Sequence, residues 1–294
     1  MPGPAAEIDI TPELVGALLR DQHPDLANRP LHSPVAGWDN VGYRLGDDLC
    51  VRLPRRAASA ALILHEQRWL RELAPGWTLP VPVPMRIGAP GAGYPWAWSV
   101  CPWLPGLEMA QVPVPDWRIV ADQLGAFLGS VHQPAPSAAP ANPYRGVPLR
   151  DRADRLEDDL GRLHLSRTDR LGLTERWMVA LDAPPWAGRP LWLHGDVHPL
   201  NLLGDEGRLS AVIDFGDLTS GDPASDLAVV WMLLPPEHRS RFRAAYDSPV
   251  AADDALWARA RGWAIALGVA FAGGDERIAP IGRRTLAAVL ADGP

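Results

Sequence analysis

Two neighbouring stretches carry the strongest pattern in the chain: Trp192-Leu-His-Gly-Asp-Val-His-Pro-Leu-Asn-Leu-Leu203 and Val212-Ile-Asp-Phe-Gly216. Apolar residues on both sides of the turn residues Gly204-Asp-Glu-Gly207 predict a β-hairpin between them. Asn201 lies six residues before Gly207, and Asp214 lies seven residues after it. Folding the hairpin therefore brings both side chains to its open end.

The polar residues around this open end have the chemistry of a magnesium and phosphate site. The amide oxygen of Asn201 and the carboxylate of Asp214 suit a hard cation such as Mg²⁺, which takes other ligands from water and nucleotide phosphates. Asp196 lies five residues before Asn201, so its carboxylate can face an acceptor hydroxyl as base or as orienting group. We expect His194 to brace the loop by hydrogen bonding, and His198 either to contact phosphate or to be exposed.

These residues resemble the kinase catalytic loop, H-x-D-x-x-x-x-N, which is followed here by a literal Asp214-Phe-Gly216. Five residue types at fixed offsets should occur by chance on the order of 10⁻⁴ times in a chain of this length. Gly195 stands where protein kinases have arginine, and residues 221–228 follow too closely for an activation loop. The chain is therefore similar to the aminoglycoside phosphotransferase family, within a wider group that includes choline, homoserine and macrolide kinases.

The resemblance implies an α+β, bilobal, protein-kinase-like fold with a small β-rich N-terminal lobe and a larger, mainly helical C-terminal lobe. We expect residues 1–101 to form the nucleotide-binding lobe, 102–106 the hinge, and 107–294 the catalytic and substrate-binding lobe. The hinge is predicted where Cys101-Pro-Trp-Leu-Pro-Gly106 interrupts regular structure, because two prolines and a glycine in six residues should not continue a central strand.

Local patterns place strands before this hinge and helices after it. Thr11 and Pro12 predict the start of a short helix, and a second helix is expected over 59–73 with Glu66 in its middle. The proline-rich stretch 134–148 is predicted to be a loop. Strands are expected over 41–45, 49–53, 85–88 and 96–100, and later helices over 116–131, 151–163, 174–181, 225–234, 237–246, 255–271 and 283–290.

The resemblance also implies which residues contact the nucleotide. Gly37-Trp-Asp-Asn40 would form the loop over the phosphates, Arg52 would replace the family's phosphate-binding lysine, and Glu66 would be its helix partner. The arginine departs from the family pattern, but it keeps a permanent charge and bidentate phosphate contacts. The carbonyl of Pro102 and the amide of Leu104 would read the purine. The full set of expected nucleotide contacts is Arg52, Glu66, Pro102, Trp103, Leu104 and His198.

Asp222 and Asp226 match the family's second acidic motif. A simpler interpretation is open for Asp222, because an aspartate before Pro223 can cap the helix that follows.

Composition excludes several other classes. All 28 basic residues are arginines, which excludes a Walker A loop, a Schiff-base enzyme and a lysine general base. The net charge of −7 argues against nucleic acid as a partner. Prolines and glycines interrupt the longest uncharged stretch, so no membrane span is expected. With only Cys50 and Cys101 and no signal-peptide pattern, we expect a cytoplasmic location, and no protein partner is evident.

The predicted function is an ATP- or GTP-dependent and Mg²⁺-dependent transfer of a γ-phosphoryl group to a hydroxyl of a small molecule. An aminoglycoside or similar antibiotic is favoured by the family and by the net acidity, which attracts a polyamine. The alternatives are a kinase of a macrolide or another hydroxylated metabolite, and a catalytically silent, nucleotide-binding pseudokinase. A protein kinase would need a glycine-rich loop and an activation segment, and a metallohydrolase would need further histidine ligands.

Overall fold

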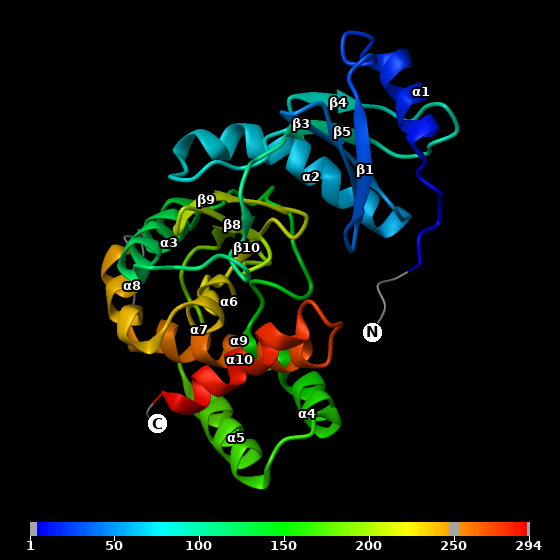
Figure 1. Cartoon of the computed structure of the whole chain (residues 1–294). Coiled ribbons are helices and arrows are strands. Elements are labelled where there is room, and N and C mark those ends of the chain that lie inside the picture. Colours follow the sequence, from blue (N-terminus) through cyan, green and yellow to red (C-terminus); the bar gives the residue numbers. More distant parts are fainter. Residues whose placement is uncertain (1–4, 247–252, 293–294) are drawn as a thin grey trace.

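The computed structural model describes residues 5–246 and 253–292, which form two lobes (Figure 1). The smaller lobe is built on a five-stranded antiparallel sheet in the order β1-β2-β3-β5-β4. Most of the helices lie in the larger lobe, together with two small sheets. The predicted α+β, bilobal fold is confirmed. The predicted lobe limits of 1–101 and 107–294 stay predictions, and residues 1–4, 247–252 and 293–294 lie outside the described residues.

The hairpin predicted in the N-terminal lobe is present as β2 and β3, in which Leu45 lies opposite Leu49. Its turn requires the left-handed backbone of Gly46, which has a φ of +62°. The strand β1 was not predicted, because five of its six residues are exposed and give no alternating pattern. The strands of this sheet are β1 (Leu31–Ala36), β2 (Asn40–Leu45), β3 (Leu49–Pro54), β4 (Arg86–Gly88) and β5 (Trp98–Pro102).

The end of β5 corrects the predicted start of the hinge. The strand continues through Pro102, which lies opposite Leu49 of β3, whereas β4 pairs only with residues 98–100 of β5. A proline is tolerated there because its missing N–H faces the side on which the sheet has already ended. The chain next pairs at β6 (Leu107–Glu108), which joins β8 in the large lobe.

Two helices flank the small sheet (Figure 1). Helix α1 (Pro12–Gln22) begins as predicted at Thr11, whose hydroxyl accepts a hydrogen bond from the amide of Leu14 at 3.3 Å. Its apolar face packs on the buried positions of β3, so the alternate residues Cys50 and Arg52 point to the opposite face. Helix α2 (Ala57–Leu73) covers that opposite face and lies between the sheet and the large lobe.

The core of the large lobe forms around α9, which packs against α5, α6 and α10. This core also contains Trp69 and Leu70 from α2 of the small lobe. The helices are α3 (Trp117–Val131), α4 (Ala153–Arg162), α5 (Arg167–Asp182), α6 (Ala224–Leu227), α7 (Val229–Leu233), α8 (Arg239–Ala245), α9 (Asp254–Ala272) and α10 (Ala279–Ala291). The remaining strands are β7 (Leu191–Leu193), β8 (Leu202–Asp205), β9 (Arg208–Val212) and β10 (Thr219–Gly221).

The predicted helices differ most from the structure at α5 and over 225–234, and α10 also begins four residues before the predicted Arg283, at Ala279. Helix α5 starts seven residues before the predicted Thr174, at a cap where the hydroxyl of Ser166 accepts from the amide of Asp169 at 3.0 Å. The first turns of α5 are mostly polar, so no helical spacing of apolar residues indicates them in the sequence. The predicted helix over 225–234 is instead two short helices, α6 and α7, that meet at Ala228. Every residue from 224 to 234 is buried, so packing on all sides replaces the one-sided pattern of a surface helix.

Candidate active site

The hairpin predicted in the large lobe is formed by β8 and β9, with Leu202 opposite Val212. Its turn is tighter than expected, because Glu206 and Gly207 alone make it with φ values of +47° and +75°. At the open end, the amide of Ile213 donates to the carbonyl oxygen of Asn201 at 2.9 Å. This bond fixes the backbone of Asn201 beside that of Ile213 and so holds Asn201 close to the start of Asp214-Phe-Gly216.

Asn201 and Asp214 present oxygen atoms that fit a magnesium ion. The amide nitrogen of Asn201 donates to the carbonyl oxygen of Asp196 at 2.9 Å, which turns its amide oxygen to other ligands. Asp214 has a left-handed φ of +62° and a side chain that is 52% exposed. Among the described residues, no group of three or more His, Cys, Asp or Glu side chains could hold a metal. A cation at this pair would therefore share its coordination shell with water and phosphate oxygens.

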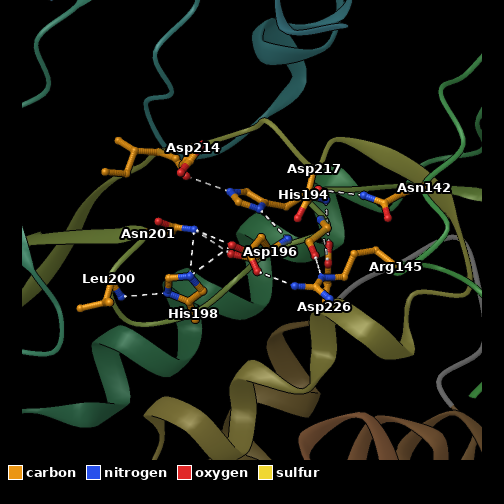
Figure 2. Close-up of polar contacts among 12 residues, drawn as sticks. Asn142, Arg145, His194, Asp196, His198, Leu200, Asn201, Asp214, Asp217 and Asp226 are labelled. Atoms are coloured by element: carbon orange, nitrogen blue, oxygen red, sulfur yellow. Dashed lines mark hydrogen bonds and ion pairs between the residues drawn. The ribbon is translucent and has the colours of Figure 1, made fainter. Parts of the chain in front are cut away.

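The carboxylate of Asp196 is bound on both of its oxygens (Figure 2). Arg145 donates from Nη2 to Oδ1 at 3.0 Å, and Nε2 of His198 lies 3.2 Å from Oδ2. Burial alone would raise the pKa of Asp196, but His198 and Arg145 outweigh it and hold this pKa well below its ordinary value. Asp196 is therefore an anion throughout the neutral pH range.

His198 is buried, with 6% of its surface exposed, so the expectation of an exposed ring is wrong. Its Nδ1 accepts from the amide of Leu200 at 3.3 Å, which places the ring proton on Nε2, next to Asp196. Both ring nitrogens are thus engaged within the catalytic loop. In this structure the His198 ring contacts Asp196. The predicted contact of His198 with a phosphate stays a prediction.

His194 braces the loop, as predicted. Its Nε2 donates to the carbonyl of Ile213 at 3.0 Å, and its Nδ1 accepts from the amide of Asp196 at 3.1 Å. Burial lowers the pKa of His194, which keeps the ring in the neutral form that this donor and acceptor pattern requires. The ring thereby joins the loop of Asp196 to the strand that leads to Asp214.

Asp226 holds the same loop from the large-lobe side. Its carboxylate accepts hydrogen bonds from the backbone amides of His194 at 2.8 Å and Gly195 at 3.0 Å, and it lies 3.2 Å from Nε2 of His132. Asp222 accepts from the amide of Ala224 at 3.1 Å and from Nε of the buried Arg259 at 2.7 Å. The N-cap residue of α6 is Pro223 and no side chain caps this helix, so the predicted capping by Asp222 is wrong. Both aspartates of the second acidic motif thus have structural contacts in this chain.

Gly195 is needed where it stands. Its φ is +88°, and a Cβ on this residue would lie 2.1 Å from the carbonyl oxygen of Asp217. The close approach requires glycine at the position where protein kinases have arginine.

Arg52 and Glu66 meet across the small lobe above this loop. Arg52 donates to both carboxylate oxygens of Glu66, with Nη2 at 3.2 Å from Oε1, and the same Nη2 lies 3.5 Å from Oδ1 of Asp214. Burial would lower the pKa of Arg52, but Glu66 and Asp214 outweigh it and keep the guanidinium charged. The structure therefore brings Arg52, Glu66 and Asp214 together.

The residues predicted to form the phosphate loop and the hinge lie in or beside two connections of the small lobe, with Asn40 at the start of β2 and Pro102 at the end of β5. Residues 37–39 join β1 to β2, and Asp39 in this turn bonds to Arg56 at 2.6 Å and to Ser59 at 2.7 Å near the start of α2. In the connection after β5, the amide of Trp103 is engaged within the protein, donating to the carbonyl of Asp48 at 2.8 Å. The predicted contacts of Pro102, Trp103 and Leu104 with a purine stay predictions.

Sequence reasoning missed three residues that contact this site: Asn142, Arg145 and Asp217. Asn142 and Arg145 lie in the proline-rich stretch 134–148 that was predicted to be a loop, and neither belongs to a spaced motif. Asn142 donates to Oδ1 of Asp217 at 2.8 Å. Burial and the nearby Asp196 raise the pKa of Asp217 to about 6. The sequence signal for this role was weak: Arg145 and Asn142 are polar residues among prolines and other turn residues in the stretch 134–148.

Comparison with known proteins agrees with this geometry. A family model described as the phosphotransferase enzyme family matches residues 32–263. The chain belongs to this family. Among curated proteins, it is 28% identical over 194 residues to the uncharacterized protein YcbJ of Bacillus subtilis (strain 168), an alignment that covers 63% of this chain and 60% of that protein. It is 29% identical over 143 residues to an aminoglycoside 3'-phosphotransferase of Escherichia coli, covering 47% and 53%. The chain thus spans between half and two thirds of these relatives' length.

Solved structures of the family share the fold over almost the whole chain. The GDP and kanamycin complex of APH(2")-IIia superposes with a TM-score of 0.69 at 19% identity, covering 94% of this chain and 98% of that one. The macrolide 2'-phosphotransferase MphH from Brachybacterium faecium superposes with a TM-score of 0.60 at 22% identity, covering 96% and 99%. These likenesses confirm the bilobal fold. In the described part of the chain, no helix has the length and apolar character to span a membrane.

Proposed function

We propose that the chain transfers the γ-phosphoryl group of ATP or GTP to a hydroxyl group of a small molecule. One observation carries this proposal: Asp196, Asn201 and Asp214 are joined around the open end of one hairpin, directly below Arg52. Phosphoryl transfer needs mainly positioning and charge stabilisation, and these four side chains supply both. The family membership and the GDP and ATP complexes of solved relatives support the nucleotide as donor.

In this proposal, Arg52 binds the phosphates and Glu66 holds it in place. The guanidinium reaches from the small lobe to within 3.5 Å of Asp214, so the predicted phosphate-binding and metal-binding side chains lie next to one another. Asn201 and Asp214 would hold Mg²⁺, which when bound neutralises charge on the phosphates. The predicted hinge contacts at Pro102, Trp103 and Leu104 would orient the purine.

Asp196 acts on the acceptor. Because Arg145 and His198 stabilise its ionised form, the carboxylate is a weak base that stays ionised and can still accept a hydrogen bond. We therefore favour the orienting role, in which Asp196 accepts a hydrogen bond from the acceptor hydroxyl and aims its oxygen at the γ-phosphorus.

The acceptor that we place first is an aminoglycoside, and a macrolide is the second candidate. The names of the relatives and solved structures support this order, because they include aminoglycoside and macrolide phosphotransferases. The half-buried carboxylate of Asp217 beside Asp196 adds negative charge where a polyamine would bind. With such an acceptor, the reaction would inactivate an antibiotic.

A coupled assay of nucleotide consumption tests the proposal against a panel of aminoglycosides, macrolides, peptide antibiotics and amino alcohols. We expect turnover with ATP or GTP and one acceptor class, and a loss on the order of 10²-fold in kcat for Asp196→Ala, because the acceptor hydroxyl loses the group that orients it. Asp214→Asn should abolish Mg²⁺-dependent nucleotide binding. A thermal shift with nucleotide and Mg²⁺ but no consumption with any acceptor would support the pseudokinase alternative and overturn ours.

A further inference from the structure

Residues 140–147, which we call the strap, cross the catalytic loop without forming a helix or a strand. The strap lies in the connection between α3 and α4 and is bound to the segment that follows Asp214-Phe-Gly216. The hydroxyl of Thr219 donates to the carbonyl of Pro140 at 3.0 Å, and Asn142 donates to the carboxylate of Asp217 at 2.8 Å. A connection with such bonds has a defined position on the site.

The backbone of Gly146 fixes the other end of the strap. Its carbonyl accepts from the amide of Asp222 at 2.9 Å, and its φ is +67°. A Cβ on Gly146 would lie 2.7 Å from the side chain of Leu193 in β7, and a Cβ on Gly221 in β10 would lie 2.1 Å from the Gly146 carbonyl oxygen. The chain therefore packs backbone to backbone at this point, one residue after Arg145.

From this fixed position, Arg145 reaches the loop of Asp196 (Figure 2). Its Nε donates to the carbonyl of Gly195 at 2.6 Å, its Nη2 donates to Oδ1 of Asp196 at 3.0 Å, and its side chain is 14% exposed. Asp196 and Asp217 are two carboxylates near one another, and Arg145 is attracted by both. The guanidinium of Arg145 thus donates hydrogen bonds to both the backbone and a side chain of the loop, at Gly195 and Asp196.

We propose that Arg145, held by the strap, is a positioning residue for phosphoryl transfer: it keeps the Asp196 carboxylate aimed at the acceptor hydroxyl. The proposal rests on the proposed function. His198 engages Oδ2 of Asp196 from another side, so Arg145 and His198 together remove the rotation of the carboxylate (Figure 2). Arg145 bonds to neither Asn201 nor Asp214, so the nucleotide site should form without it.

Steady-state kinetics with the best acceptor of the panel test this role. For Arg145→Met we expect kcat to fall on the order of 10²-fold while the KM for nucleotide changes less than twofold, because a displaced reacting group costs rate and not nucleotide binding. Arg145→Lys should recover about tenfold, since one ammonium replaces one of the two contacts. Arg189→Met, on an exposed arginine, is the matched control and should behave as the wild type. Wild-type kcat in Arg145→Met would overturn the proposal.

Gly146→Ala tests the strap while leaving the guanidinium in the chain. The added methyl is strained at the φ of +67° and lies 3.2 Å from backbone atoms of both Ser220 and Gly221, so we expect the strap to shift and kcat to fall at least tenfold with nucleotide KM retained. Unchanged kcat in this variant would exclude a role for the strap.

A crystal structure of Arg145→Met separates this proposal from the proposed function, because it needs no turnover. We expect the Asp196 carboxylate to rotate away from its present place while Asn201 and Asp214 stay where they are. An Asp196 side chain that keeps its orientation would overturn the positioning role, whatever reaction the protein catalyses. If Asp196 moves but the wild type consumes no nucleotide, the positioning role stands and the proposed function fails.

Discussion

Gly195 packs its α-carbon against the carbonyl of Asp217, so closely that a Cβ on residue 195 would lie 2.1 Å from that oxygen. The contact joins the loop that carries Asp196 to the turn that follows Asp214. Together with the left-handed φ of +88°, it explains why no side chain is present at this position. The segments that carry Asp196 and Asp214 are thus held at a fixed separation by backbone contact.

Gly195→Ala should therefore destabilise the protein and reduce its activity. We expect the free energy of unfolding to fall by about 2 kcal/mol or more, because the methyl adds strain and a clash with backbone atoms. Urea denaturation measures this change. Gly161→Ala is the control: Gly161 lies in α4, and a Cβ there would meet no atom within 4 Å, so alanine should be neutral or stabilise by about 0.5 kcal/mol. Equal effects of the two substitutions would contradict the prediction.

Asp226 should matter for stability more than for chemistry. Asp226→Ala leaves the buried amides of His194 and Gly195 without their acceptor, so we expect a loss of about 2 to 5 kcal/mol in the free energy of unfolding. The exposed Asp205 provides the comparison, since Asp205→Ala should change stability by about 0.5 kcal/mol at most. A fully stable Asp226→Ala protein would show that the loop does not depend on this carboxylate.

Removing Arg52 should have two separable effects. Arg52→Met leaves the carboxylate of Glu66, which is 1% exposed, without its partner, and we expect a cost of about 3 to 5 kcal/mol. The double variant Arg52→Met with Glu66→Met should recover most of that stability, because apolar pairs replace buried ion pairs without penalty. Nucleotide affinity, measured by titration calorimetry, should stay lost in both. Recovered nucleotide binding in the double variant would remove Arg52 from the phosphate site.

The stability difference between Asp217→Asn and the wild type should depend on pH. The pKa of Asp217 is about 6 in the folded protein and lower in the unfolded chain, so the folded state binds more protons between these values. Wild-type stability from this group is therefore present at low pH and lost as the pH rises through 6. Asparagine does not titrate, and it keeps the acceptor for Asn142.

Urea denaturation at pH 4 and pH 7 measures this difference. We expect Asp217→Asn to gain about 2 kcal/mol relative to the wild type between the two pH values, a figure reduced from the full shift because Asp217 is only partly buried. A constant difference would mean that Asp217 titrates at its ordinary pKa.

The hairpin of β8 and β9 could be predicted from the sequence because the residues that determine it are close together in the chain. Asn201 and Asp214 are close in space because they lie at the two ends of one hairpin. The cap at Thr11 and the turn at Gly46 likewise depend on residues that are close in the sequence. Residue spacing within a few turns of chain is sufficient for such features.

Arg145 could not be predicted, because its role depends on where a loop lies after folding. It is 51 residues from Asp196 and belongs to a segment with neither helical nor strand period. The anchoring role of Asp226 is similar, since its partners are the amides of His194 and Gly195, which carry no side-chain signature. Strand β1 was missed because its exposed residues lack the alternation of a half-buried strand.

The position of α2 has a mechanical consequence. Trp69 packs against Trp192 with the two rings tilted and their centroids 4.9 Å apart, and it belongs to the core of the large lobe, one helical turn after Glu66. Helix α2, which carries Glu66, is thus packed against both lobes, so it cannot move away from the small sheet without breaking its contacts with the large lobe. The ion pair between Arg52 and Glu66 is therefore supported from both lobes, and the proposed phosphate-binding guanidinium keeps its place only as long as α2 stays packed on the large lobe.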